Sequence, residues 1–481
     1  MDHTSAEKQS GCKDDQKTIV QYEPSTSPTS GDGATQKPYT VLSERAKIAT
    51  ILLVATINGG AFFASTVYYP ALHSISKDLN VSFSNIYLTI TAYLIIQGIA
   101  PMFTGSISDR KGRRPILFIS MLIFIATSIG LACQNNFAVL MALRCLQSIG
   151  MAGVFAPTLG LVVDIIARSQ RGKYMIYMTM GSTIGTSTGP IIGGALTKAL
   201  GWRSIFWETC RAVVGNGSIP PPAWNRPLLY RNSLVAADFE TQTIFSSPPG
   251  ILDCFRMLFN KQTGLLIFFW SSICWGQIVI EVSLPRVLGE KYHLDPLQVG
   301  LCYIPWAVGA ITARWSVGSL ADWNFRRHGR KVGVDVQPNR QTKEQLEILP
   351  LERIRLDIAI PAVYLVCIFT AAYTWALSSK VHISCPLVLL FFLGNTIAGA
   401  VGVTSALIMD LKAYTPGTAR GAMAIFRSLP AAGITAAINP AIASIGFGWL
   451  GTIFCGFWVI ASSILWLVYF RGHSWRTNKE T

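Results

Sequence analysis

Long apolar segments separated by short polar ones fill the chain from residue 48 to residue 470. A helix that crosses a bilayer core of about 30 Å needs about 20 consecutive, mostly apolar residues. Segments of this kind lie at residues 48–69, 83–104, 115–133, 137–163, 174–196, 264–284, 299–320, 357–377, 386–409, 422–445 and 448–470. The pattern therefore predicts an all-α membrane protein with eleven spans.

The polar connections alternate between basic and non-basic, and this alternation indicates the orientation of the spans. Lys and Arg stay preferentially on the cytoplasmic side of a membrane. Basic residues precede the first span, follow the second and fourth spans, and recur after residue 320, between residues 412 and 420 and after residue 470. We therefore expect both termini in the cytoplasm.

One crossing is missing between Lys198 and Gln262. The fifth span leaves the chain outside near Gly201, whereas the basic residues before the next span place its start inside. No apolar window of sufficient length lies between them, and the segment that follows Gly201 becomes polar after Trp207. We therefore expect a sixth helix to be absent.

This topology divides the chain into a bundle of five spans and a bundle of six. The expected parts are a disordered cytoplasmic tail (1–44), an N-terminal bundle (45–207), a cytoplasmic central loop (208–262), a C-terminal bundle (263–471) with a basic cytoplasmic loop (323–356), and a cytoplasmic tail (472–481).

The composition excludes several classes of protein. Charged residues make up 14% of the chain, against about 25% in soluble proteins. The net charge of +15 could suggest a nucleic-acid partner, but the basic residues flank apolar runs and do not gather on a soluble face. We also find no metal-binding Cys/His cluster, no phosphate-binding loop and no acid/base cluster in the spans. We therefore expect no enzyme, no metal, no cofactor and no nucleic acid, but a lipid bilayer as partner.

The chain contains an internal repeat. The stretch "GSISDRKGRRP" begins at Gly105, and "GSLADWNFRRH" begins 213 residues later at Gly318, each directly after the second span of its half. Parallel repeats of six helices are the plan of one large class of secondary transporters. The repeat therefore predicts two pseudo-symmetric helical bundles.

Three motifs carry a resemblance to a known family. "GSISDRKGRRP" matches a loop signature of the major facilitator superfamily, "LRCLQSIG" (143–150) its fourth-helix signature, and "GTSTGPIIGG" (185–194) its antiporter signature. The chain more narrowly resembles the fungal drug:proton antiporters with twelve spans, in the quinidine-resistance and dityrosine-exporter branch. In that branch "ETCR" (208–211) follows a complete sixth span, which agrees with the missing crossing.

The resemblance implies a secondary active transporter in the plasma membrane. It would work as a monomer and export small amphipathic or cationic molecules in exchange for protons, with the proton gradient as energy source in place of a cofactor. The alternative is a non-transporting or misfolded product of an incomplete gene model. The sequence does not identify the substrate.

Four ionisable or polar residues inside spans are candidates for substrate binding or proton coupling. Arg at mid-membrane costs roughly 2.5–3.5 kcal/mol on insertion scales, so Arg144 should face a cavity or a partner, with Gln147 on the same helix face. Arg427 and Glu281 complete the set. A structural polar contact for the first pair, and a position at the membrane interface for Glu281, are the alternatives.

Two further groups of residues are expected to serve gating. The resemblance implies that Asp109 and Arg113 latch with Asp164, although a solvated charge cluster is the alternative. The full set is Gly105, Asp109, Arg110, Gly112, Arg113, Arg114, Asp164, Gly318, Asp322 and Arg326. The antiporter motif, Gly185, Gly189, Pro190, Gly193 and Gly194, either forms a helix-packing face or bends its helix to close the outer gate.

Aromatic residues are abundant in the spans, among them Tyr68, Tyr69 and Tyr93. Most such residues pack between helices or anchor the membrane interface. A subset is expected to line a cavity, but periodicity does not identify which.

Overall fold

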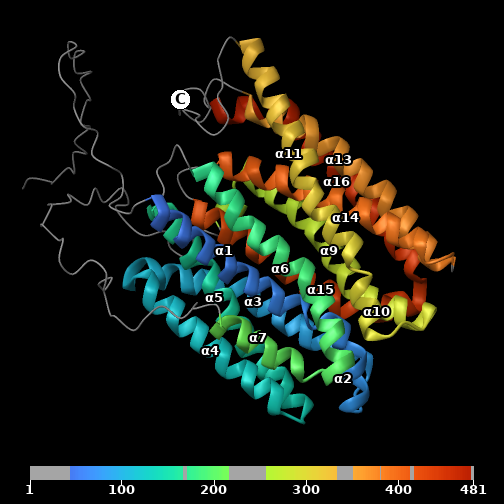
Figure 1. Ribbon diagram of the computed structural model, residues 1–481. Coiled ribbons are helices and arrows are strands. Elements are labelled where there is room, and N and C mark those ends of the chain that lie inside the picture. The colour runs from blue at the N-terminus through green and yellow to red at the C-terminus, as the bar shows by residue number, and fades with distance from the viewer. Residues whose placement is uncertain are drawn as a thin grey trace, which may run out of the picture. The chain divides into compact units, whose positions relative to one another are not determined.

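The computed structural model describes residues 44–165, 171–215, 256–332, 350–379, 381–411 and 416–477 (Figure 1). All regular structure in this part of the chain is helical. Ten helical segments there are long and apolar enough to cross a membrane. Helix α6 (Arg171–Leu200), with 30 residues, also has the length to cross. The expectation of an all-α membrane protein is confirmed.

The described part of the first half contains seven α-helices and a short 3₁₀ turn. Helix α1 (Glu44–Thr66) is followed by the 3₁₀ turn η1 (Tyr69–Ala71) and by α2 (Leu72–Asp78). The remaining helices of this half are α3 (Phe83–Lys111), α4 (Arg113–Cys133), α5 (Phe137–Ile165), α6 and α7 (Ser204–Gly215).

The second half repeats the plan with a longer final helix. Its described helices are α9 (Lys261–Tyr292), α10 (Pro296–Leu301), α11 (Ile304–Val332), α13 (Leu351–Ser378), α14 (Ser384–Leu411), α15 (Pro416–Ile445) and α16 (Phe447–Thr477).

The same helix pairs pack in both halves. Helix α3 packs against α5 as α11 packs against α14, and α4 packs against α5 as α13 packs against α14. Helix α1 lies along α6, and α9 lies along α15 in the same way. The two halves are therefore related as the sequence repeat predicts, and they meet through α3 against α15 and α6 against α11.

At one end of the molecule, the segments that connect the helices are joined by polar contacts. Arg203, before α7, donates hydrogen bonds to Asp78 at the end of α2 and to Asn135 between α4 and α5. Lys198 near the end of α6 forms an ion pair with Asp295 before α10. We call this the α10 end.

The opposite end, which we call the basic end, holds the start of α9 and α13 and the end of α16. There Gln262 donates to Glu352, and Tyr469 donates to Asp357. Helices α3 and α11 both run from the α10 end toward the basic end. The two copies of the repeat, which begin at Gly105 and Gly318, therefore lie toward the same end of the molecule.

Helix α7 occupies the sixth position of the first half. It packs against α4 as α16 packs against α13, but it has 12 residues where α16 has 31. Its first turn is anchored by buried Ile205 and Phe206, and the indole of Trp202 donates to Asp78. A 12-residue helix is about 18 Å long, too short for a bilayer core of about 30 Å. The helix continues to Gly215, so residues 208–215, which were expected to begin the central loop, are helical.

The basic loop expected at 323–356 begins later than predicted. Helix α11 continues through the basic residues to Val332, and α13 begins at Leu351. The reason is that Arg and Lys have good helix propensity, and these side chains project into solvent on the helix surface. Residues 333–349 lie outside the described residues.

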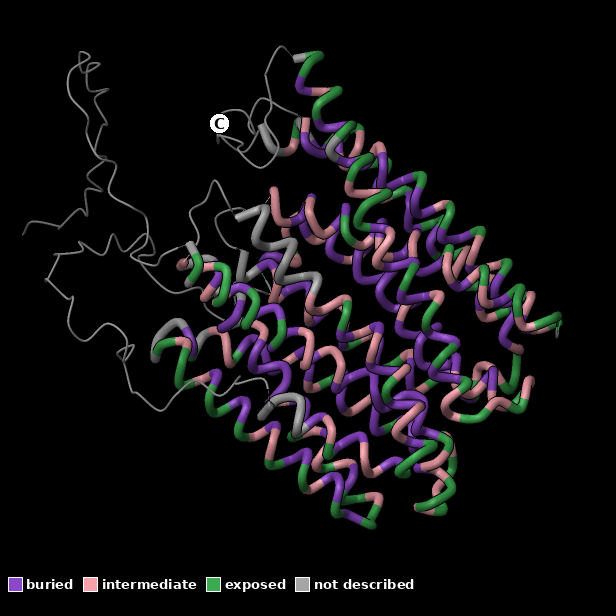
Figure 2. The backbone as a smooth tube through the Cα atoms, viewed as in Figure 1, coloured by how far each residue is buried: buried purple, intermediate pink, exposed green. Residues whose placement is uncertain are grey.

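Burial follows the helix contacts (Figure 2). Buried residues line the faces along which helices pack. The outer helices α4 and α16 expose large apolar side chains, among them Leu122 (53% exposed) and Ile460 (75% exposed). Soluble proteins rarely leave such surfaces bare, so these faces fit contact with lipid tails.

A glycine stripe joins α6 to α1. A Cβ added to Gly185 would overlap the carbonyl oxygen of Gly59, and one added to Gly193 would overlap that of Val67. Gly189 meets Thr66 in the same way. Close backbone approach through small residues is a common means of helix association in lipid. Three of the five motif residues thus form a packing face within the first half.

Replacing Gly185 with Ala is expected to lower the melting temperature of the purified protein, because overpacking a tight helix contact costs about 1–3 kcal/mol. Gly60→Ala on α1 is the matched control, since nothing lies within 4 Å of its added Cβ. That control should leave the melting temperature unchanged or raise it slightly. Equal behaviour of the two variants in thermal unfolding would contradict the packing role of the stripe.

Candidate functional site

Arg144 lies two turns into α5, with 1% of its surface exposed. Its guanidinium carbon is 3.9 Å from the ring centroid of Tyr68 and 4.8 Å from that of Tyr93. Aromatic faces attract cations at such distances, and more strongly when the pair is removed from water. The α1–η1 junction and α3 thus supply two rings that hold the cation of α5.

The structure brings Gln147 to Arg144, as the i, i+3 spacing predicts. Arg144 Nη1 donates a hydrogen bond of 2.7 Å to Gln147 Oε1. Gln147 Nε2 donates in turn to Ser128 Oγ on α4, at 3.1 Å. Ser128 was not singled out from the sequence, because a serine in an apolar span gives no signal of its own.

Arg144 has no ion pair with any carboxylate in the described part of the chain, and its Nε has no hydrogen-bond partner there. A buried cation without a counter-ion carries a desolvation cost that aromatic and amide contacts only partly offset. An anionic group placed beside this guanidinium would offset the remaining cost.

Glu281 and Arg427 come from the second half of the chain. Glu281 on α9 is 6% exposed and accepts a hydrogen bond of 2.8 Å from Gln277. It interacts electrostatically with Arg427 of α15, whose guanidinium carbon lies 5.8 Å from the ring centroid of Phe62 on α1. The structure therefore buries Glu281 between helices, whereas its position relative to the membrane interface stays a prediction.

The charges of both halves act on one tyrosine. Tyr69, buried at the bend after α1, interacts electrostatically with Glu281, Arg427 and Arg144. The four candidate residues thus lie in the zone where the two halves face each other. This zone contains two cations and one carboxylate from the candidate set.

The two halves are in direct contact at the α10 end. Lys198 Nζ is 2.8 Å from Asp295 Oδ2 across the halves, and Tyr87 donates a hydrogen bond of 3.1 Å to the carbonyl of Val282. A Cβ on Gly194 would overlap the carbonyl of Pro296 in α10.

The antiporter motif therefore contains two contact surfaces. Gly185, Gly189 and Gly193 face α1, whereas Gly194 faces α10 of the other half, and the carbonyl of Pro190 lies against Gly300. The packing face expected from the sequence thus has its residues in place, and the role of the motif in closing an outer gate stays a prediction.

The residues of the first repeat sit at a one-residue break between helices. Helix α3 ends at Lys111 and α4 begins at Arg113, with Gly112 at φ +92° between them. Glycine adopts this backbone conformation at little cost. Gly105 lies in α3, Arg114 in α4, and Gly318 and Arg326 in α11. The side chains of Asp109, Arg110, Asp164 and Asp322 lie outside the described ones, so the latch stays a prediction.

Comparisons with known proteins agree with this architecture. The model of the family described as "Major Facilitator Superfamily" matches residues 54–435. The chain is 35% identical over 458 residues to the MFS-type transporter clz19 of Cochliobolus lunatus, which covers 91% of this chain and 87% of the relative. It is 36% identical over 478 residues to the MFS-type transporter tstD of Talaromyces stipitatus, which covers 92% and 84%.

A more distant relative has a substrate in its name. Citrate exporter 1 of Aspergillus niger is 27% identical over 498 aligned positions, which cover 97% of this chain and 93% of that protein.

Replacing Arg144 with Met should separate a functional role from a structural one. Removing a desolvated cation that no carboxylate neutralises is expected to raise the melting temperature by about 2 °C or more. Thermal unfolding of the purified protein measures this. Arg203→Met is the control: Arg203 pairs with Asp78 at the surface and lies 4.3 Å from the Trp202 ring centroid, so its loss should lower the melting temperature. A marked drop for Arg144→Met would favour the structural contact.

Proposed function

Since the chain belongs to the major facilitator superfamily and is a multi-pass membrane transporter, we propose that it exports small amphipathic molecules and that Arg144 binds an anionic group of the substrate. The observation that carries the proposal is the burial of Arg144 without a carboxylate partner in the described chain. The name of one relative, a citrate exporter, supports it, because citrate is a carboxylate.

Charge in the zone between the halves favours an anion over the cation expected from the resemblance. Arg144 and Arg427 outnumber Glu281 among the candidate residues. An arginine fork matches carboxylate geometry through two parallel hydrogen bonds. With the basic end in the cytoplasm, a membrane potential negative inside would favour exit of an anion by about 2.3 kcal/mol per charge per 100 mV.

Glu281 links substrate charge to the direction of proton movement. A cationic substrate would compete with a proton for the Glu281 carboxylate, which gives proton exchange. An anionic substrate would instead compete with Glu281 for Arg427, and protonation of Glu281 would then favour substrate binding. Cation export by proton antiport is therefore the second candidate, favoured by the burial of Glu281.

The sixth position supports a third, non-transporting alternative. We infer that α7 is a truncated sixth crossing, because its 12 residues stand where the second half has the 31 residues of α16. The candidate site is carried by α1, α3, α5, α9 and α15, and α7 does not contribute to it.

We propose the plasma membrane as the location, with both termini cytoplasmic and the α10 end outside.

Export is tested with two fluorescent dyes on one scaffold, one carrying a carboxylate and the other a quaternary ammonium group. In cells with confirmed surface expression, the carboxylate dye should leave faster than from cells without the protein. Arg144→Gln should slow this export at least about tenfold, the effect of losing about 1.4 kcal/mol of binding. Arg203→Gln, a surface control, should stay within about twofold.

The other outcomes of this assay decide between the alternatives. Export of the ammonium dye alone would replace the anion proposal by cation:proton antiport. Export of neither dye, over a panel of further amphipathic anions and cations, would favour the non-transporting product.

Glu281→Gln should distinguish the two coupling schemes, because Gln resembles the protonated carboxyl. With an anionic substrate, export should stay within about threefold of the wild type and should no longer change with cytoplasmic pH. With a cationic substrate it should fall at least about tenfold. Glu290→Gln is the matched control, since Glu290 is an exposed partner of Arg286 on the same helix. A pH response that persists in Glu281→Gln would remove Glu281 from the coupling role.

A further inference from the structure

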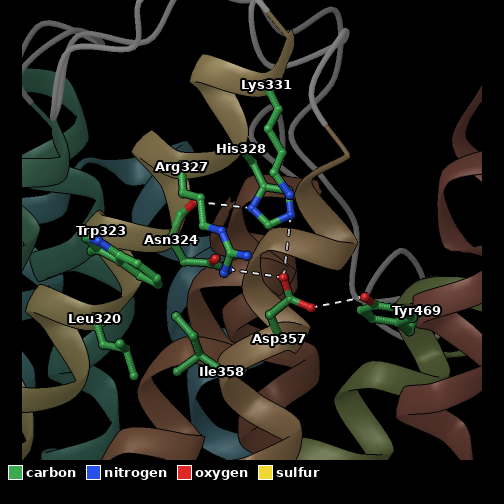
Figure 3. A pocket seen from close by; sticks show the side chains of 9 residues that line it. All are labelled: Leu320, Trp323, Asn324, Arg327, His328, Lys331, Asp357, Ile358 and Tyr469. Carbon is green, nitrogen blue, oxygen red and sulfur yellow. Dashed lines mark hydrogen bonds and ion pairs between the residues drawn. The ribbon is translucent and has the colours of Figure 1, made fainter.

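A basic depression surrounds the last turns of α11 at the basic end. One pocket of about 480 Å³ lies between α11, α13 and α16 (Figure 3). A second pocket of about 600 Å³ lies on the adjoining side of α11. The two pockets share Trp323, Arg327 and Lys331, so these side chains stand on the ridge between them.

The charges around this depression are cationic and exposed. Arg326, Arg327, Arg330 and Lys331 all project from the last turns of α11, and none forms an ion pair with a residue in the described part of the chain. The guanidinium carbon of Arg327 lies 5.4 Å from the ring centroid of Trp323, which is 57% exposed. The cations are therefore gathered without a protein counter-ion among the described residues.

The one carboxylate that lines the pocket is already occupied. Asp357 Oδ1 accepts a hydrogen bond of 3.0 Å from Tyr469, and its Oδ2 accepts one of 3.3 Å from Asn324 Nδ2. His328 Nε2 lies 3.5 Å from the same Oδ2. Figure 3 shows these contacts beneath Arg327 and Lys331, joining α11, α13 and α16. This network fixes the floor and leaves the cations above it available to a ligand.

The depression lies where the apolar part of α11 gives way to its charged part. Leu320 and Trp323 are exposed just before the basic run, and the candidate span ends at Lys331. Exposed tryptophan is typical of the interface between lipid tails and water, where lipid headgroups lie. Basic pockets at the cytoplasmic side of membrane helices attract anionic headgroups.

We propose that this depression binds the headgroup of an anionic membrane lipid that carries phosphate monoesters, with Arg327 and Lys331 as its main ligands. Guanidinium groups bind phosphate oxygens through paired hydrogen bonds, and an ammonium group adds a point charge. A volume of about 480 Å³ is within the range of small-molecule sites. This site is remote from Arg144 and does not depend on the proposed transport activity.

The test measures lipid binding by the purified full chain in detergent. Native mass spectrometry would follow a titration with short-chain phosphatidylinositol bisphosphate. Phosphatidylserine, soluble inositol trisphosphate and inorganic phosphate are titrated separately as comparison ligands. The wild type should bind the bisphosphate lipid at least about tenfold more tightly than the other three compounds. Arg327→Gln/Lys331→Gln should lose at least about tenfold in affinity for that lipid.

Two variants keep the result interpretable. Arg45→Gln/Arg471→Gln removes the same charge from exposed positions outside the depression, and it should keep its affinity within about twofold. Arg327→Lys/Lys331→Arg keeps the charge and should retain most of the binding, which excludes a folding defect. If Arg45→Gln/Arg471→Gln lost as much lipid affinity as Arg327→Gln/Lys331→Gln, binding would depend on overall positive charge and not on this depression. That result would overturn the proposal. Equal affinity for the lipid and the soluble trisphosphate would overturn its lipid form.

Discussion

The lipid bilayer offers the backbone no hydrogen-bond partner, and most of this architecture follows from that constraint. Each described crossing is a helix, and helices in lipid associate through close packing more than through hydrophobic burial. The glycine stripe of α6 meets this need against α1, and Gly194 continues it against α10 of the other half. One motif thus joins a contact within a bundle to a contact between the two bundles.

The polar residues of the candidate site are placed by that helix packing. Arg144 is held by two tyrosine rings and by Gln147, which α4 supports through Ser128. Glu281 and Arg427 reach the same zone from the other half. An arrangement with more cations than carboxylates is costly in a dry interior, and such cost is retained most readily where a ligand or a proton relieves it. This is the physical argument behind the proposed anionic substrate and the proposed coupling through Glu281.

The two halves differ most at their sixth helices. Helix α16 completes a crossing beside α13, whereas α7 covers only the part of α4 nearest the α10 end. Trp202, Ile205 and Phe206 are buried, so the first turns of this short helix pack against the bundle although the apolar run is short. The difference in length between α7 and α16 lies outside the helices that carry Arg144, Glu281 and Arg427. The short α7 therefore does not change the side chains of the candidate site.

The sequence by itself determined the membrane class, the positions of the spans, the repeat and the pairing of Arg144 with Gln147, because each depends on hydropathy, charge or spacing along one segment. It misjudged the start of the basic loop and the extent of α7, because amphipathic and charged helix turns resemble loops in a hydropathy pattern. Only the tertiary structure decided that Tyr68 and Tyr93 hold Arg144, that Glu281 is buried, and that Asp357 is occupied beneath the basic end of α11. These contacts join side chains from distant segments, and helix packing alone determines which of them meet.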